Sequence, residues 1–134
     1  FFGIYDNTLL IGYIAGTSAM MGHIFPLYYG FKGGKGVLMA ATTLLAIDPL
    51  TFCIVIPFFA LILFITRYVS ISSILAAIAY PVTTLITQLI RGYDTALIDA
   101  GFALIIGAII IYMHRANIER LRNGTENKFV FNKK

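Results

Sequence analysis

Apolar residues fill most of the chain, and short polar breaks divide them into five apolar segments. These segments run over Thr8–Phe25, Gly36–Ile47, Leu50–Thr66, Ser70–Leu89 and Thr95–Met113. A helix needs about 20 residues to cross a hydrocarbon core of ~30 Å, and only a helix satisfies its own backbone polar groups within lipid. The pattern therefore predicts an all-α, polytopic transmembrane helical bundle with about five spans, the second of them short.

The composition agrees with a membrane protein. Hydrophobic residues make up 59% of the 134 residues and charged residues only 12%, whereas ordinary soluble domains carry roughly 25% charged residues. We interpret residues 1–134 as a single integral membrane domain. The one cysteine excludes an internal disulfide, and His23 and His114 have no cysteine cluster near them. This pattern predicts no zinc-type metal site. We also expect no cofactor and no nucleic-acid partner.

The basic residues follow alternate segments. If all five segments cross, nine of the ten lysines and arginines share one side of the membrane, and only Arg91 lies opposite, together with Asp48. The nine are Lys32, Lys35, Arg67, Arg115, Arg120, Arg122, Lys128, Lys133 and Lys134. The positive-inside rule then predicts a cytoplasmic C-terminal tail, residues 114–134, and places Phe1 outside.

Two glycines, Gly12 and Gly16, lie four residues apart in the first segment. Small residues at this spacing allow two membrane helices to pack closely. Glycine is also common in membrane helices without such a contact, so the sequence leaves both interpretations open.

The polar break between the first two segments reads GFKGGKGV at residues 30–37. Its glycines expose backbone N–H groups, and a helix that begins at about Gly34 would present its N-terminus to an anion. Lys32 and Lys35 add positive charge, so the chemistry fits a phosphate. This is not a Walker A loop, because Gly36 follows Lys35 where that motif has Ser or Thr. A flexible basic loop is the alternative.

The second polar break, RYVSISSI at residues 67–74, joins the third and fourth segments. Arg67 ends one segment, and Ser70 and Ser73 open the next. These serines either cap the helix that follows, as serine often does, or belong to a site beside the arginine.

The third polar stretch, HRANIERLRNGTENK at residues 114–128, follows the last segment. His114 and Asn117 are three residues apart and share one face of a helix. That face either belongs to a site or is part of a basic helix on anionic lipid. Since all three polar stretches fall on one membrane face, they favour a water-accessible site where a phosphorylated substrate meets a lipid-borne group.

Together, GHIFPLYYGFKGGKGV, RYVSISSI and HRANIERLRNGTENK resemble the bacterial acyl-phosphate:glycerol-3-phosphate acyltransferase family, from about Gly22 to Lys128. The resemblance implies that a fatty acyl group passes from acyl phosphate to the 1-hydroxyl of glycerol 3-phosphate, which gives lysophosphatidic acid in phospholipid biosynthesis. It also implies a multi-pass protein among the lipids of the bacterial inner (cytoplasmic) membrane, with its active site facing the cytoplasm.

The same resemblance assigns roles to three groups of residues: a phosphate cradle, a group that binds or polarises substrate, and a pair that orders the cradle and the glycerol phosphate. The phosphate cradle comprises Gly33, Gly34, Gly36, Lys32 and Lys35. The group that binds or polarises substrate comprises Ser70, Ser73 and Arg67, and the ordering pair is His114 and Asn117. We expect Lys35, Ser70, Ser73, His114 and Asn117 to be catalytic. His114 could act as a general base, although the donor's phosphate could accept the proton instead. For His23 we favour a structural hydrogen bond over a direct role in substrate binding.

The family's first motif, a glycine-, serine- and asparagine-rich segment that ends in arginine, has no counterpart in this chain. The resemblance implies seven helices in the complete protein, so we expect that this chain lacks the N-terminal two and is inactive without them. The alternative to an enzyme is a non-enzymatic membrane transporter or subunit that binds phosphorylated metabolites at the same loops.

Overall fold

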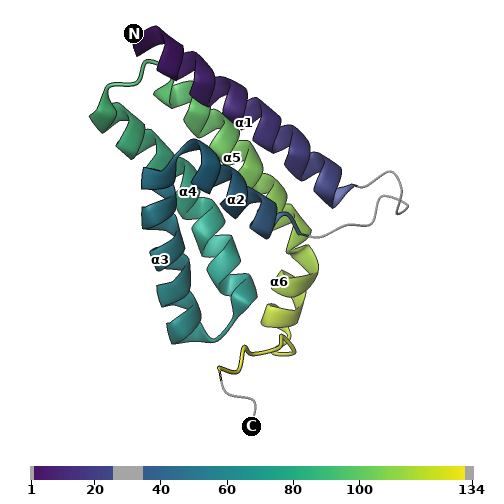
Figure 1. The fold of residues 1–134 in the computed structure, drawn as a ribbon. Coiled ribbons are helices and arrows are strands. Elements are labelled where there is room, and N and C mark those ends of the chain that lie inside the picture. Colours follow the sequence, from purple (N-terminus) through teal and green to yellow (C-terminus); the bar gives the residue numbers. More distant parts are fainter. Residues whose placement is uncertain (1, 26–34, 132–134) are drawn as a thin grey trace.

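The computed structural model describes residues 2–25 and 35–131, and over these residues it contains helices and no strands. The helices are α1 (Phe2–Ile24), α2 (Val37–Ile47), α3 (Pro49–Thr66), α4 (Val69–Arg91), α5 (Ala96–Met113) and α6 (Arg115–Arg122). Each of the first five contacts the next in chain order, and α5 also packs along α1 (Figure 1). The predicted all-α fold is therefore confirmed.

Helix lengths bear on the predicted number of spans. In the described part of the chain, α3, α4 and α5 are long and apolar enough to cross a membrane, whereas the apolar helices Thr8–Ile24 and Val37–Ile47 are shorter. Length and composition thus support three spans, and crossing by the other two helices stays a prediction.

The start of α2 differs from the prediction. The helix begins at Val37 and not at about Gly34, because Gly36 precedes it with a left-handed φ of 78°. Glycine adopts this conformation without the steric cost that a Cβ brings. A Cβ on Gly36 would also lie 2.9 Å from the Cδ1 of Ile24. As a result Lys35 lies outside the helix, on the segment that approaches it.

Glycines allow the helices to approach closely at two interfaces. A Cβ on Gly16 would lie 2.1 Å from the Cγ2 of Thr43, and one on Gly12 would lie 3.0 Å from the Cγ1 of Ile47. The close-contact interpretation of this glycine pair is therefore confirmed, with α2 as the partner of α1. On α5, Gly107 packs against the backbone of α4 in the same way.

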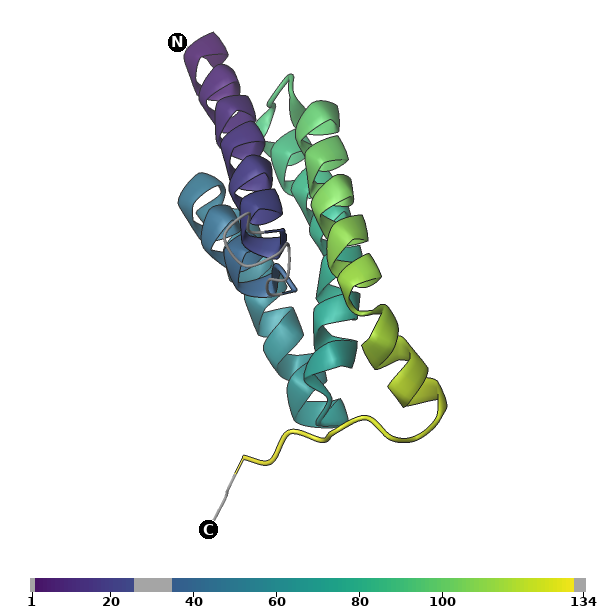
Figure 2. The same ribbon diagram turned by 90° about the vertical axis from the view of Figure 1, so that its right-hand side faces the viewer.

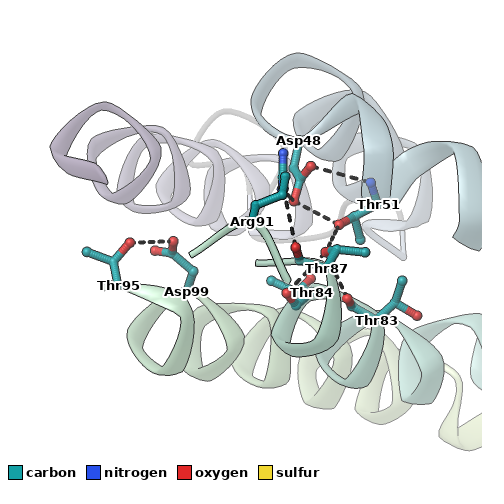
Figure 3. A network of polar contacts seen from close by, with 8 residues as sticks. All are labelled: Asp48, Thr51, Thr83, Thr84, Thr87, Arg91, Thr95 and Asp99. Atoms are coloured by element: carbon teal, nitrogen blue, oxygen red, sulfur yellow. Dashed lines mark hydrogen bonds and ion pairs between the residues drawn. The ribbon is translucent and has the colours of Figure 1, made fainter. Parts of the chain in front are cut away.

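A buried polar layer joins α2, α3 and α4 (Figure 3). Asp48, fully buried between α2 and α3, accepts hydrogen bonds from the Thr51 hydroxyl at 2.7 Å and from Nη2 of Arg91 at 2.8 Å. The Thr51 and Thr87 hydroxyls lie 2.8 Å apart. The charge pattern had placed Asp48 and Arg91 at the same side of the bundle, and the two form an ion pair.

The other end of the bundle gathers three chain segments that are distant in sequence. Figures 1 and 2 show α2 beginning close to the junction of α5 and α6, and the structure places the start of α4 beside both. This is where the candidate site lies.

Candidate functional site

A pocket of about 420 Å³, here called the polar pocket, lies where the start of α2, the start of α4 and the junction of α5 and α6 meet. Its lining brings together most of the residues that the sequence had singled out. Those residues are His23, Lys35, Gly36, Ser70, Ser73, His114 and Asn117. The helical fold thus assembles one site from residues that lie far apart in the sequence.

A chain of polar contacts fixes the position of the Lys35 ammonium. Its Nζ donates a hydrogen bond to Oδ1 of Asn117. The Asn117 Nδ2 donates in turn to Oε1 of Glu126 at 2.8 Å, and Nε of Arg120 donates to Oε2 of the same carboxylate at 2.9 Å. Asn117 thus contacts Lys35, the residue that it was expected to order, and its role in the site stays a prediction. Sequence reasoning had not singled out Glu126.

The end of α6 explains why Glu126 returns to the pocket. Gly124 has a left-handed φ of 71°. The N–H of Thr125 bonds the carbonyl of Arg120 at 2.8 Å, and the N–H of Gly124 bonds that of Leu121 at 3.3 Å. This is the Schellman pattern that ends a helix at glycine and reverses the chain. A glycine two residues before a glutamate was the available signal for this turn.

The Glu126 carboxylate is favoured in its ionised form. Desolvation is the largest single influence on its pKa and raises it, but hydrogen bonds from Asn117 and Arg120, together with the positive charges of Arg120 and Lys35, outweigh it and lower the pKa. The resulting anion orients the Asn117 amide so that its oxygen faces Lys35.

His114 is buried at the junction of α5 and α6, with 3% of its surface exposed. Its Nδ1 lies 2.8 Å from the carbonyl oxygen of Ile110, which can only accept, so Nδ1 carries a proton. Burial, and next the positive charge of Lys35, lower the pKa of His114, although the bond to Ile110 opposes them. The neutral ring therefore keeps Nε2 as an acceptor.

Ser70 and Ser73 lie in the first turns of α4, and both are buried in the pocket lining. The helix is capped by Tyr68, without a side-chain cap bond, so the capping interpretation of these serines is wrong. Within the described part of the chain, neither hydroxyl has a hydrogen-bond partner. A buried hydroxyl normally has one, so both are available to a bound molecule.

Other predicted residues have different outcomes. Lys32, Gly33 and Gly34 lie outside the described residues. His23 lines the polar pocket with an exposed side chain, and it makes no hydrogen bond to another described residue. The structural hydrogen bond favoured for His23 is thus not found among the described residues.

Arg67 does not line the polar pocket. It ends α3 with a left-handed φ of 62°. Its guanidinium lies 4.9 Å from the ring centroid of Phe131, and its carbonyl accepts the Phe129 N–H at 2.6 Å. The residue therefore forms the turn into α4 and holds the C-terminal tail there.

A second pocket of about 60 Å³, here called the apolar pocket, adjoins the polar one. The two share Val37, Phe59 and Ser73. Beyond these, the apolar pocket is lined by Ala40, Ala41, Leu44, Val55, Ile56, Ala76, Ala77, Tyr80 and Ile110. The polar pocket, which is lined by cationic and hydroxyl side chains, thus continues into the apolar pocket. This arrangement suits an amphipathic ligand.

Comparison with known proteins agrees with the resemblance inferred from the sequence. Residues 1–124 match the glycerol-3-phosphate acyltransferase family. A glycerol-3-phosphate acyltransferase of Chlorobaculum tepidum is 44% identical, over 96% of this chain and 62% of the relative. One of Chlorobaculum parvum is 42% identical with the same coverage. The chain thus spans about 62% of the length of these curated relatives.

Solved structures show the same fold. The glycerol 3-phosphate form of PlsY, an integral membrane glycerol 3-phosphate acyltransferase, is 36% identical with a TM-score of 0.75 over 88% of this chain and 56% of that chain. Its lysophosphatidic acid form is 31% identical with a TM-score of 0.71, over 95% of this chain and 71% of that chain.

Proposed function

The chain belongs to the glycerol-3-phosphate acyltransferase family, and on that premise we propose that it takes part in transferring a fatty acyl group to glycerol 3-phosphate at a membrane. The proposed donor is acyl phosphate, and the proposed products are lysophosphatidic acid and phosphate. One observation carries the proposal: Lys35, Ser73 and His114 come from separate elements and line one pocket.

The reaction requires positive charge, because both substrates carry phosphate. Lys35 supplies it beside Gly36, and both residues line the polar pocket. Asn117 and Glu126 hold the ammonium in place. A positioned charge loses less freedom when substrate binds, so this arrangement favours the bound state.

The unpaired serine hydroxyls suit the developing negative charge. In the proposed step the 1-hydroxyl oxygen of glycerol 3-phosphate attacks the acyl carbonyl carbon. The carbon–oxygen bond to phosphate then breaks, and phosphate leaves with the bonding electron pair. Ser70 and Ser73 donate toward the substrate oxygens, where donors already in place stabilise the transition state. Arg67 acts through the turn that positions these serines.

The proton of the attacking hydroxyl has two possible acceptors. One is Nε2 of His114, which the Nδ1 bond to Ile110 leaves unprotonated in the neutral ring. The other is an oxygen of the donor phosphate. If His114 is the base, His114→Ala lowers turnover by ~10²-fold or more. If phosphate is the base, the loss falls mainly on the binding of glycerol 3-phosphate.

The acyl chain of the donor would occupy the apolar pocket. Val37, Phe59 and Ser73 line both pockets, so a carbonyl carbon placed near Ser73 has phosphate groups on one side and apolar volume on the other. Burial of the chain supplies binding energy in proportion to the apolar area removed from water.

The location proposed is the bacterial inner membrane, with the polar pocket on the cytoplasmic side. The basic residues around this end of the bundle support that orientation, since positive charge is enriched in cytoplasmic loops. Arg91, the cation at the opposite end, is paired with Asp48.

The decisive experiment supplies labelled glycerol 3-phosphate and acyl phosphate to the purified protein in bilayers. Label recovered in lysophosphatidic acid, with one phosphate released per product, supports the proposal. Uptake of label into vesicles without acylation would instead favour the transporter. Because the chain spans about 62% of the length of its curated relatives, it is assayed both alone and together with the segment of the Chlorobaculum tepidum relative that it does not match.

A further inference from the structure

The residues that line the apolar pocket extend away from the polar pocket along three helices. Val37 on α2 and Ser73 on α4 line both pockets, and Leu44 and Tyr80 lie seven residues further along the same two helices. At a rise of 1.5 Å per residue, this separation corresponds to a depth of ~10 Å. On α3, Phe59 lines both pockets, and Val55, four residues before it, lines only the apolar pocket.

A polar layer lies one helical turn beyond the far end of this lining. Asp48 follows Leu44 by four residues on α2, Thr84 follows Tyr80 by four on α4, and Thr51 precedes Val55 by four on α3. All three polar residues are 0% exposed. Figure 3 shows this layer, in which Asp48 binds both Thr51 and Arg91.

Such a layer forms a firm floor for an apolar ligand. A chain that entered it would separate buried hydrogen-bonding groups, and each group left without a partner is costly. Tyr80 lines the apolar pocket and carries a buried hydroxyl, so it adds a polar group at this end of the pocket.

The side walls of the pocket are made by small residues. Ala40 and Ala41 on α2 line it, and so do Ala76 and Ala77 on α4. The volume exists because these four side chains are single methyl groups, so a larger residue at any of them shortens the space between Ser73 and the floor.

We propose that Leu44, Val55 and Tyr80, supported by the polar layer, close the acyl-chain pocket and determine the chain length up to which a longer donor binds better. This rests on the proposed function. Up to the floor, each methylene adds about fourfold to kcat/KM from burial. Beyond it, further methylenes find no apolar volume and add nothing, so kcat/KM against chain length rises and then levels off at a break.

Variants of α2 test the proposal from both directions. Ala41→Leu fills the pocket from a half-buried wall position and moves the break to shorter donors. Its control, Ala46→Leu, makes the same change at an exposed position outside the pocket. Leu44→Ala removes the closing side chain and moves the break to longer donors. Its control is Leu45→Ala, where the side chain is 49% exposed.

The assay measures lysophosphatidic acid formed from glycerol 3-phosphate and acyl phosphates of graded chain length. The expected result is opposite shifts in Ala41→Leu and Leu44→Ala, with both controls at the parent break. Ala76→Leu, on the facing wall, replaces any filling variant that unfolds. Turnover with an identical break in every variant overturns the chain-length proposal and leaves the function intact. Absence of turnover with all donors, also when the unmatched segment of the Chlorobaculum tepidum relative is supplied, overturns the proposed function and with it this inference.

Discussion

The ammonium of Lys35 donates a hydrogen bond to the amide oxygen of Asn117, 82 residues further along the chain. This contact joins the segment before α2 to α6, and the Glu126 carboxylate secures the amide from its other side. The orientation of the amide follows from its partners, because only its oxygen can accept from Lys35 and only its nitrogen can donate to a carboxylate.

Loss of the Lys35 charge is expected to abolish acyl transfer nearly completely while the protein stays folded. The side chain is exposed in the pocket, so Lys35→Ala removes charge and little packing. Turnover and glycerol 3-phosphate affinity are compared with those of Lys128→Ala, whose ammonium lies over the Tyr68 ring outside the pocket. Near-normal activity with intact affinity would remove the phosphate-binding role from Lys35.

Asn117→Leu is expected to lower kcat/KM by roughly 10- to 100-fold. The substitution keeps the side-chain size but leaves Lys35 and Glu126 without their shared partner, and a hydrogen bond to a charged group contributes ~1.5–3 kcal/mol. The kinetic constants for glycerol 3-phosphate are measured beside those of Asn123→Leu, at the exposed end of α6. Equal kinetics in the two variants would show that the amide does not position the lysine.

The titration of His114 makes stability depend on pH in a defined direction. Its pKa in the folded protein lies below the ordinary value of 6.5, because burial and Lys35 disfavour the charged ring. As the pH falls below 6.5, the unfolded chain takes up the proton first, so the free energy of unfolding decreases until the pH passes the folded pKa. Above pH 6.5 the contribution of the neutral His114 ring to the free energy of unfolding is fully present.

The unfolding temperature of the protein and of His114→Gln, measured from about pH 8 to about pH 5, checks this prediction. The parent should lose more stability than the variant over the acidic part of the range. In addition, Lys35→Met should raise the pKa of His114 observed by NMR, since the lysine charge is one cause of its depression. A His114 pKa at or above 6.5 in the parent would contradict both expectations.

Gly107→Ala should destabilise the bundle by about 1–3 kcal/mol, the usual effect of overpacking. Its Cβ would lie 2.5 Å from the carbonyl oxygen of Ala77, and a backbone atom in a helix cannot move aside. Gly101→Ala on the same helix is the matched control, because a Cβ there meets nothing within 4 Å. Thermal unfolding in detergent compares the two, and equal melting temperatures would show that α4 and α5 have room to separate.

Arg91→Met should destabilise the protein by about 3 kcal/mol, because it leaves the buried Asp48 carboxylate without its cation. Removing both partners, in Asp48→Leu/Arg91→Met, should recover part of that loss. Unfolding of the two single variants and the double variant gives the coupling between the residues. Additive effects would mean that the ion pair contributes nothing of its own.

The sequence alone determined the all-α membrane fold and most helix boundaries within a few residues, although α1 begins at Phe2 and not at the predicted Thr8. Each apolar segment ends at local features, such as Asp48–Pro49 before α3 and Gly92 after α4, which act independently of the rest of the chain. The same applies to the three polar stretches, whose motifs identified the family before any packing was known.

Tertiary structure decided which of these residues meet. His114 and Asn117 were expected in the site from their motif, but the hydrogen bond between Asn117 and Lys35 depends on α5 and α6 packing beside the start of α2. The hydrogen bond between Asn117 and Glu126 depends on the turn at Gly124. The position of Arg67 outside the pocket depends on its contact with Phe131. Local patterns set helices because their causes lie within one or two turns, whereas these contacts join residues whose distance is fixed only when the helices pack.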